Sequence, residues 1–239
     1  MISIQNVHKT YIDGDTEVRA LRGVSMNISA GEFLSIAGPS GSGKTTLLNL
    51  IGCIDSLDAG EIHIKEHAIS SMKPKELTEL RRRSIGYIFQ SFNLIPVLSA
   101  YENVALTLSL LDISKHEVYK RSMAILQEVG LAGMEHRRPS KLSGGQQQRV
   151  AVARALVKDP LIVLADEPTA NLDSETGEAI LQLMKRINDE HGTTFIFSTH
   201  DPMVMHYADR LCQLHDGEIQ SDSLVAAAAG QVTEPAGGA

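Results

Sequence analysis

The chain has 239 residues, a formal net charge of −7 and 43% apolar residues, enough for the packed core of one α/β domain. The acidic balance argues against a nucleic-acid binder that relies on a broad basic surface. Its two cysteines indicate no disulfide framework or zinc site, and no apolar stretch is long enough for a membrane span. The N-terminus has no signal-peptide pattern, so we expect a cytoplasmic protein without a membrane span of its own.

Short apolar runs rich in β-branched residues alternate with helical patterns along the chain, which predicts an α/β fold. Early strands are expected at Ile2–Val7 and Val24–Ile28, and the apolar run Glu32–Ala37, closed by a glycine, predicts a buried strand. Asp216-Gly217 lies between two short apolar runs and predicts a hairpin turn. Further strands are expected at Ile85–Phe89, Leu161–Ala165, Thr194–Phe197, Arg210–Leu214 and Glu218–Gln220.

Helical patterns dominate the middle of the chain, where Ala100 to Leu156 carries few strand signals. A second helix is expected at Ser174–Glu190, with Asp173 as its N-cap. Because strands lie on both sides of the helical middle, we predict an α/β core with a helical insertion at about 91–157. Residues 1–220 are expected to form one domain, and the Ala/Gly-rich tail 221–239 is expected to be disordered.

The first chemical motif fits G-x-x-x-x-G-K-[ST] and lies between the strand that ends at Ala37 and an expected helix, Lys44–Leu50. Its glycines let backbone N–H groups point at phosphate oxygens, and the helix N-terminus adds positive potential. We expect Lys44 to contact the β- and γ-phosphates and the Thr45 hydroxyl to bind Mg²⁺. The candidate nucleotide-binding residues here are Gly38, Pro39, Ser40, Gly41, Ser42, Gly43, Lys44, Thr45 and Thr46.

The second motif is an acidic pair, Asp166 and Glu167, at the C-terminal end of the expected strand Leu161–Ala165. Parallel sheets place their ligands at this end of the strands. We expect Asp166 to hold Mg²⁺, mainly through water, and Glu167 to orient and polarise an attacking water. By itself, such an acidic pair could equally belong to a turn on the protein surface. Together with the phosphate-binding loop, it indicates phosphoryl transfer.

The third motif is Leu142-Ser143-Gly144-Gly145-Gln146, at the start of an expected helix. Ser143 is a typical N-cap, and this structural role is the simpler interpretation. Ser-Gly-Gly at a helix start also leaves N–H groups free for an anion. The sequence therefore predicts two phosphate-binding helix N-termini in one chain.

The ordered set of motifs resembles the ABC transporter ATPase family over roughly residues 2–220, and Leu142–Gln146 matches that family's signature sequence without a mismatch. The resemblance implies a P-loop NTPase core with an N-terminal antiparallel β-subdomain, which binds ATP and Mg²⁺ and hydrolyses ATP. It also implies that two chains, most simply a homodimer, close on two ATP molecules, each between one P-loop and the opposing signature. The signature residues assigned to the nucleotide are Ser143, Gly144, Gly145 and Gln146.

The resemblance assigns four further positions. Tyr11 matches an aromatic that stacks on adenine, with a core tyrosine as the alternative. Gln90 matches a glutamine that senses Mg²⁺ and the γ-phosphate, and His200 a histidine that contacts the γ-phosphate; both have a purely structural alternative. Ala170–Asp173 matches a loop that crosses between the two chains, with Asp173 at the nucleotide. The implied catalytic set is Lys44, Gln90, Glu167 and His200, and the implied metal ligands are Thr45, Gln90 and Asp166.

Several stretches, including Phe89–Pro96 and the triple glutamine 146–148, resemble the LolD/MacB branch of the family. This resemblance implies an integral membrane permease partner, no nucleic acid, and a location at the cytoplasmic face of the bacterial inner membrane. The work implied is lipoprotein release or envelope efflux. An FtsE-like regulatory ATPase of cell division and an importer subunit remain alternatives. The apolar residues between Phe92 and Leu98 either receive the permease or pack inside the helical insertion.

Overall fold

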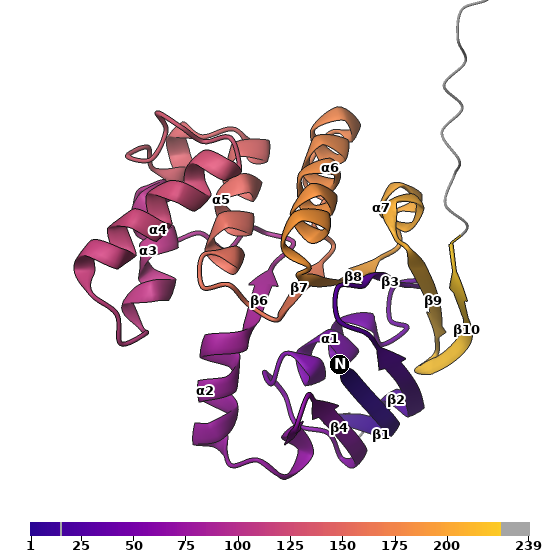
Figure 1. Ribbon diagram of the computed structural model, residues 1–239. Helices are drawn as coiled ribbons and strands as arrows, with labels where there is room; N and C mark the ends of the chain where they lie inside the picture. Colours follow the sequence, from indigo (N-terminus) through magenta and orange to yellow (C-terminus); the bar gives the residue numbers. More distant parts are fainter. Residues whose placement is uncertain (15, 226–239) are drawn as a thin grey trace, which may run out of the picture.

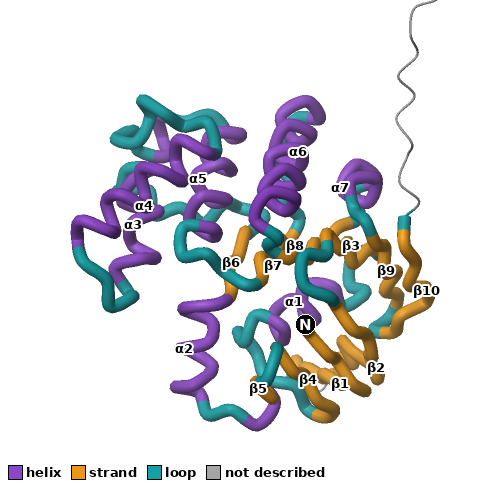
Figure 2. The backbone as a smooth tube through the Cα atoms, in the orientation of Figure 1, coloured by secondary structure: helices purple, strands orange, loops and turns teal. Residues whose placement is uncertain are grey.

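The computed structural model describes residues 1–14 and 16–225 and contains two β-sheets with helices around them (Figure 1). The N-terminal sheet is antiparallel, with the strand order β2-β1-β4-β5. Figure 2 shows these strands grouped at one end of the molecule. The strands are β1 (Ile2–Asp13), β2 (Thr16–Ile28), β4 (Ala59–Ile64) and β5 (His67–Ala68).

The second sheet has the order β10-β9-β3-β8-β7-β6. From β6 to β9 all neighbours are parallel, and β10 pairs antiparallel with β9. Because parallel strands share a direction, the loops after β3, β6, β7 and β8 emerge at the same edge. The strands are β3 (Phe33–Ala37), β6 (Ile85–Ile88), β7 (Ile162–Asp166), β8 (Thr194–Thr199), β9 (Arg210–His215) and β10 (Glu218–Leu224).

The helices divide into those that cover the parallel sheet and those that form the insertion. In Figure 1, α3, α4 and α5 gather on the side away from the N-terminal sheet. Among the described residues, none of the helices is long and apolar enough to cross a membrane. The helices are α1 (Lys44–Ile51), α2 (Pro74–Ser84), α3 (Ala100–Ser109), α4 (Lys115–Glu128), α5 (Gly144–Leu156), α6 (Ser174–His191) and α7 (Pro202–Tyr207), with 3-10 turns at Ile69–Ser71 and Pro139–Lys141.

The core lies on both faces of the parallel sheet. On one face, α1 packs between the two sheets, with Leu47, Leu48 and Ile51 fully buried. On the other face, α5 and α6 cover a layer of aromatic rings, in which the centroids of Phe33 and Phe197 lie 4.5 Å apart. Each fully buried side chain of this size stabilises the fold by about 1.5–3 kcal/mol. The strands that deliver the site loops are therefore held from both sides.

The predicted fold class is confirmed, including the N-terminal antiparallel sheet and the helical insertion. β1 runs beyond the expected end at Val7 because it pairs with β2 as far as Asp13. The turn at Asp216-Gly217 joins β9 to β10 as expected, but β10 continues to Leu224, so the boundary expected at residue 220 falls inside a strand. Of the tail 221–239 that was expected to be disordered, residues 221–224 instead form the end of β10, and residues 226–239 lie outside the described residues.

Candidate nucleotide site

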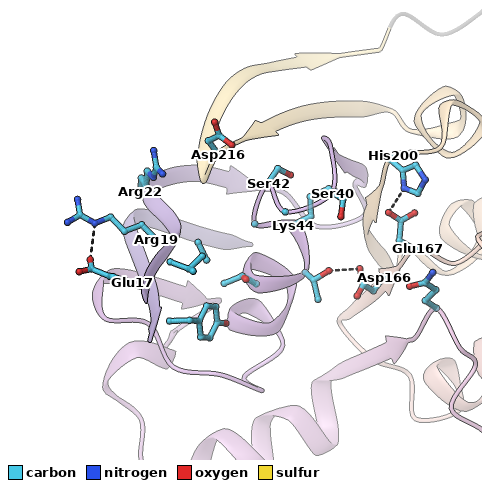
Figure 3. Close-up of a pocket in the computed structure, with 18 residues that line it drawn as sticks. Glu17, Arg19, Arg22, Ser40, Ser42, Lys44, Asp166, Glu167, His200 and Asp216 are labelled. Carbon is cyan, nitrogen blue, oxygen red and sulfur yellow. Dashed lines mark hydrogen bonds and ion pairs between the residues drawn. The ribbon is translucent and has the colours of Figure 1, made fainter. Parts of the chain in front are cut away.

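A pocket of about 730 Å³ opens at the carboxyl edge of the parallel sheet (Figure 3). The loop between β3 and α1 forms its floor, and the residues that follow β6, β7 and β8 form one wall. The sequence-predicted residues that the structure brings together here are Tyr11, Ser40, Gly41, Ser42, Gly43, Lys44, Thr45, Thr46, Gln90, Asp166, Glu167 and His200.

Helix α1 points its N-terminus at this pocket. Its N-cap, Gly43, has a φ of 100°, and a Cβ there would lie 2.4 Å from the carbonyl oxygen of Ala20. This position therefore requires glycine. No acidic side chain stands in the first turn, Lys44 to Leu47, to cancel the positive end of the helix. The backbone thus presents a ready anion site.

Lys44 is nearly buried in the wall of the pocket. Its Nζ donates to the carbonyl oxygens of Gly38 at 2.8 Å and Pro39 at 2.9 Å. Gly38 and Pro39 do not line this pocket but line a neighbouring one that also includes His200. Burial lowers the pKa of Lys44, and the charges of Glu167 and Asp166 oppose that change. A phosphate group in the pocket would replace these carbonyls with a full negative charge for the ammonium.

Oxygen ligands for a divalent cation meet at the base of the pocket. The Thr45 hydroxyl donates to Oδ1 of Asp166 at 3.1 Å, and Gln90 lines the same space. Hydroxyl, carboxylate and amide oxygens are the hard ligands that Mg²⁺ prefers. The donor set therefore fits Mg²⁺ held between these side chains and substrate phosphates.

Glu167 is held in a defined position at the pocket wall. Its backbone has a φ of 46°, uncommon for a non-glycine residue, and its N–H donates to the carbonyl oxygen of Ser198 at 2.9 Å. One carboxylate oxygen accepts from Nδ1 of His200 at 2.7 Å, and the other from the Thr199 hydroxyl at 3.3 Å. The His200 side chain is 69% exposed and that of Glu167 only 15%. The pair joins an exposed imidazole to a sheltered carboxylate, and Figure 3 marks the hydrogen bond between them.

Tyr11 lies at the other end of the pocket and is not a core residue, since the residue is 38% exposed. Its hydroxyl donates to Asp55 at 2.7 Å, and Nζ of Lys9 lies 5.1 Å from its ring centroid. These contacts fix the ring at the pocket edge. Burial and the Asp55 carboxylate raise the pKa of Tyr11.

The sequence analysis missed the charged residues on this side of the pocket. They come from β2 and from the β9–β10 turn, so no contiguous motif marks them. The one sequence signal for them is the run of charged and polar residues at the start of β2. This end of the long strand is exposed, whereas the rest of the strand alternates between buried and exposed residues. The missed pocket residues are Glu17, Val18, Arg19, Ala20, Arg22 and Asp216.

The remaining predicted residues lie outside this pocket. In the described chain, its wall does not include Ser143–Gln146 or Asp173. Ser143 is the N-cap of α5 and forms a capping box with Gln146, with bonds of 3.0 and 3.3 Å. Asp173 is the N-cap of α6, as predicted, and the N–H and hydroxyl of Thr176 hold the pKa of its carboxyl low.

The fold and the pocket define a P-loop nucleotide hydrolase. A helix N-terminus and a lysine face the phosphate position, oxygen ligands stand beside it, and a held carboxylate completes the set. These are the parts that phosphoryl transfer to water requires.

The comparisons with known proteins identify the family. A family model described as ABC transporter matches residues 21–170. The chain therefore belongs to the ABC transporter family and is its ATP-binding domain, an ATPase. It is 48% identical over 229 residues to an uncharacterised ABC transporter ATP-binding protein, MJ0796, of Methanocaldococcus jannaschii, covering 93% of this chain and 96% of that protein.

Two further matches bear on architecture. The macrolide export ATP-binding/permease protein MacB of Syntrophobacter fumaroxidans is 44% identical over 93% of this chain, which spans only 32% of that longer protein. A dimeric structure of a post-hydrolysis state of MJ0796, bound to ADP and Pi, superposes with a TM-score of 0.86 at 46% identity, covering 94% of this chain and 98% of that one. The ATP-binding fold is therefore shared along nearly the whole chain.

Proposed function

We propose that this chain is an ATP-hydrolysing subunit that closes as a homodimer over two ATP molecules and drives a separate membrane permease of the LolD/MacB type. The observation that carries the proposal is the division of its phosphate-binding elements. The P-loop, Asp166, Glu167 and His200 share one pocket, whereas Ser143–Gln146 begins a second helix outside it. The dimeric MJ0796 structure supports the step from this division to a second copy of the chain.

The pocket residues that the sequence predicted have the following roles in this proposal. The N–H groups of the P-loop and Lys44 bind the β- and γ-phosphates, and Tyr11 stacks on the adenine. Thr45, Asp166 and Gln90 hold Mg²⁺, which when bound neutralises charge on the phosphates. Glu167 orients the attacking water and accepts its proton, and His200 steadies both Glu167 and the γ-phosphate. The signature residues of the second chain, with its Asp173, close the site from the other side.

The route to the permease starts at Gln90. Its backbone carbonyl accepts a hydrogen bond of 2.8 Å from the side chain of Asn171, in the loop after Glu167. The segment that follows carries Ile95, 38% exposed, and Val97, 68% exposed, while Leu94 packs against the core. In the proposal the exposed side chains receive a helix of the permease, so a change at the nucleotide reaches the membrane partner through this segment.

The test is a pull-down from membranes with the Glu167→Gln variant in the presence of ATP, followed by identification of the protein that copurifies. A permease with few spanning helices and a large extracytoplasmic domain is the expected result. Lys44→Ala serves as the control that binds nucleotide poorly and should capture less. A division protein or a many-helix importer would overturn the LolD/MacB assignment, and capture of no membrane protein would overturn the coupling to a permease.

A further inference from the structure

Gln148 is a fully buried amide on α5, where the neighbouring buried residues Val150, Ala151 and Val152 are apolar. Its Nε2 donates to the carbonyl oxygen of Pro168 at 2.7 Å, and because a carbonyl only accepts, this bond fixes which end of the amide is the nitrogen. The Oε1 end accepts no hydrogen bond from any described residue. A buried amide with one unpaired end destabilises the folded state relative to an apolar side chain of the same size. A functional role would explain the amide at this position.

The carbonyl that Gln148 binds belongs to the residue directly after Glu167. The backbone at Glu167 is in the left-handed region, with a φ of 46°, and such a conformation persists only where the surroundings hold it. The hydrogen bond from the Glu167 N–H to the carbonyl oxygen of Ser198 holds this backbone conformation on the N-terminal side. Gln148 holds it on the C-terminal side, from the helix that begins with the signature residues.

The start of α5 packs on the loop after Glu167 at a second place. A Cβ on Gly145 would lie 2.4 Å from Cγ2 of Thr176, and one on Gly144 would lie 3.5 Å from Cδ2 of Leu172. The glycines therefore let the signature sit directly on this loop and on the first turn of α6. A shift of the α5 N-terminus is passed on both through this contact and through Gln148.

We propose that Gln148 is a positioning residue that couples the signature helix to Glu167 within one chain. This inference rests on the proposed dimer. When the nucleotide of the second chain engages Ser143–Gln146, α5 moves or stiffens, and the bond to Pro168 adjusts the carboxylate of the first chain. Hydrolysis at one site of the dimer then depends on occupancy of the other, through one buried amide in each chain.

The decisive variant is Gln148→Met, which keeps the length and approximate volume of the side chain and removes the donor. We expect nucleotide affinity and ATP-dependent dimerisation to match the wild type. We expect kcat to fall about tenfold, because a small displacement of a catalytic group is enough to do this. The Hill coefficient for ATP should fall below the wild-type value, to the cooperativity that dimerisation alone gives. Gln148→Asn, a shorter and milder change, should act in the same direction if Gln148→Met does not fold.

Asn188→Leu is the matched control for a purely structural role. Asn188 is also a buried amide that donates to backbone carbonyls, those of Gly31 and Thr193, each at 2.8 Å, but it lies at the far end of α6. Its loss should lower the melting temperature and leave kcat and the Hill coefficient unchanged. Gln148 variants that behave like Asn188→Leu would overturn the coupling role alone. A wild-type chain with no ATPase activity or no ATP-dependent dimer would overturn the proposed function as well.

Discussion

The two helix N-termini that can receive phosphate differ in what surrounds them. The α1 N-terminus opens into a pocket with Lys44, Asp166 and Glu167 within one wall. The α5 N-terminus carries the capped signature and stands outside that wall. In the proposed dimer, the first binds and positions a nucleotide within one chain, whereas the second contacts the nucleotide that the other chain holds.

The largest effect is expected from Glu167→Gln, which keeps the shape of the side chain and removes the proton acceptor. ATP hydrolysis should fall by about 10²- to 10⁴-fold, while nucleotide affinity changes little. Phosphate release and nucleotide titration measure the two quantities. Glu190→Gln, at an exposed position near the end of α6, should hydrolyse ATP as the wild type does. Wild-type turnover in Glu167→Gln would contradict the role of this carboxylate.

Lys44→Ala tests the pocket as a binding site. Removal of a charged hydrogen-bond donor from the phosphate position should weaken nucleotide binding by about 10- to 100-fold. Calorimetric titration of the isolated chain measures this change. Lys120→Ala, an exposed position on α4, should bind nucleotide normally. Unchanged affinity in Lys44→Ala would mean that the nucleotide does not lie on this loop.

Ser143→Ala should give the opposite pattern. Loss of the α5 N-cap should lower the free energy of unfolding by about 0.5–2 kcal/mol and leave the nucleotide affinity of the isolated chain unchanged. Ser114→Ala removes the corresponding N-cap of α4, where Ser114 accepts from the N–H of Glu117 at 3.2 Å. Only Ser143→Ala should also weaken ATP-dependent dimerisation. Equal dimerisation of the two variants would show that the signature does not contact nucleotide.

The smallest effect concerns Lys158, a half-buried lysine just beyond the C-terminal end of α5 that ties this end to α2. Nζ of Lys158 donates to the carbonyl oxygens of Arg81 and Arg82, each at 2.9 Å. Burial, with a contribution from the charge of Arg81, lowers the pKa of Lys158 from its ordinary 10.5 to about 8. Between these two values the unfolded chain binds more protons than the folded chain, so the contribution of Lys158 to stability rises with pH.

Melting temperatures of the wild type and Lys158→Met from pH 7 to 10 measure this contribution. As the pH rises above 8, the melting temperature of the wild type should increase relative to that of the variant. The increase should be about 2–4 °C for each kcal/mol added to the free energy of unfolding. A difference that stays constant or shrinks over this range would contradict the lowered pKa.

The parts of the site that could be predicted from the sequence are those that one contiguous motif carries. The loop before Lys44 and the pair Asp166 and Glu167 follow apolar strands directly, so both residue type and location are readable. Arg22 and Asp216 reach the same pocket from β2 and from a distant turn, and only the folded sheets bring them there. Their charges on an exposed strand and in a turn look like ordinary surface residues.

The fold shows the same contrast. The central strands β3 and β8 of the parallel sheet are buried throughout and stand out as apolar runs, whereas α2 buries only Leu80 and carries three arginines in its last turn. With so little apolar periodicity, its helical state is not visible in the pattern. Proline at its first position and the hydrogen bond from the backbone N–H of Lys73 to the Glu76 carboxylate start the helix instead.

The most direct test of the two-chain site is the mass of the Glu167→Gln variant in solution, measured by light scattering with and without ATP. We predict one chain without nucleotide and two chains with ATP, and a single chain again when Ser143→Arg is added to the same variant. If Glu167→Gln binds ATP and remains a single chain, or if the double variant dimerises equally well, the signature of one chain does not close the nucleotide pocket of another.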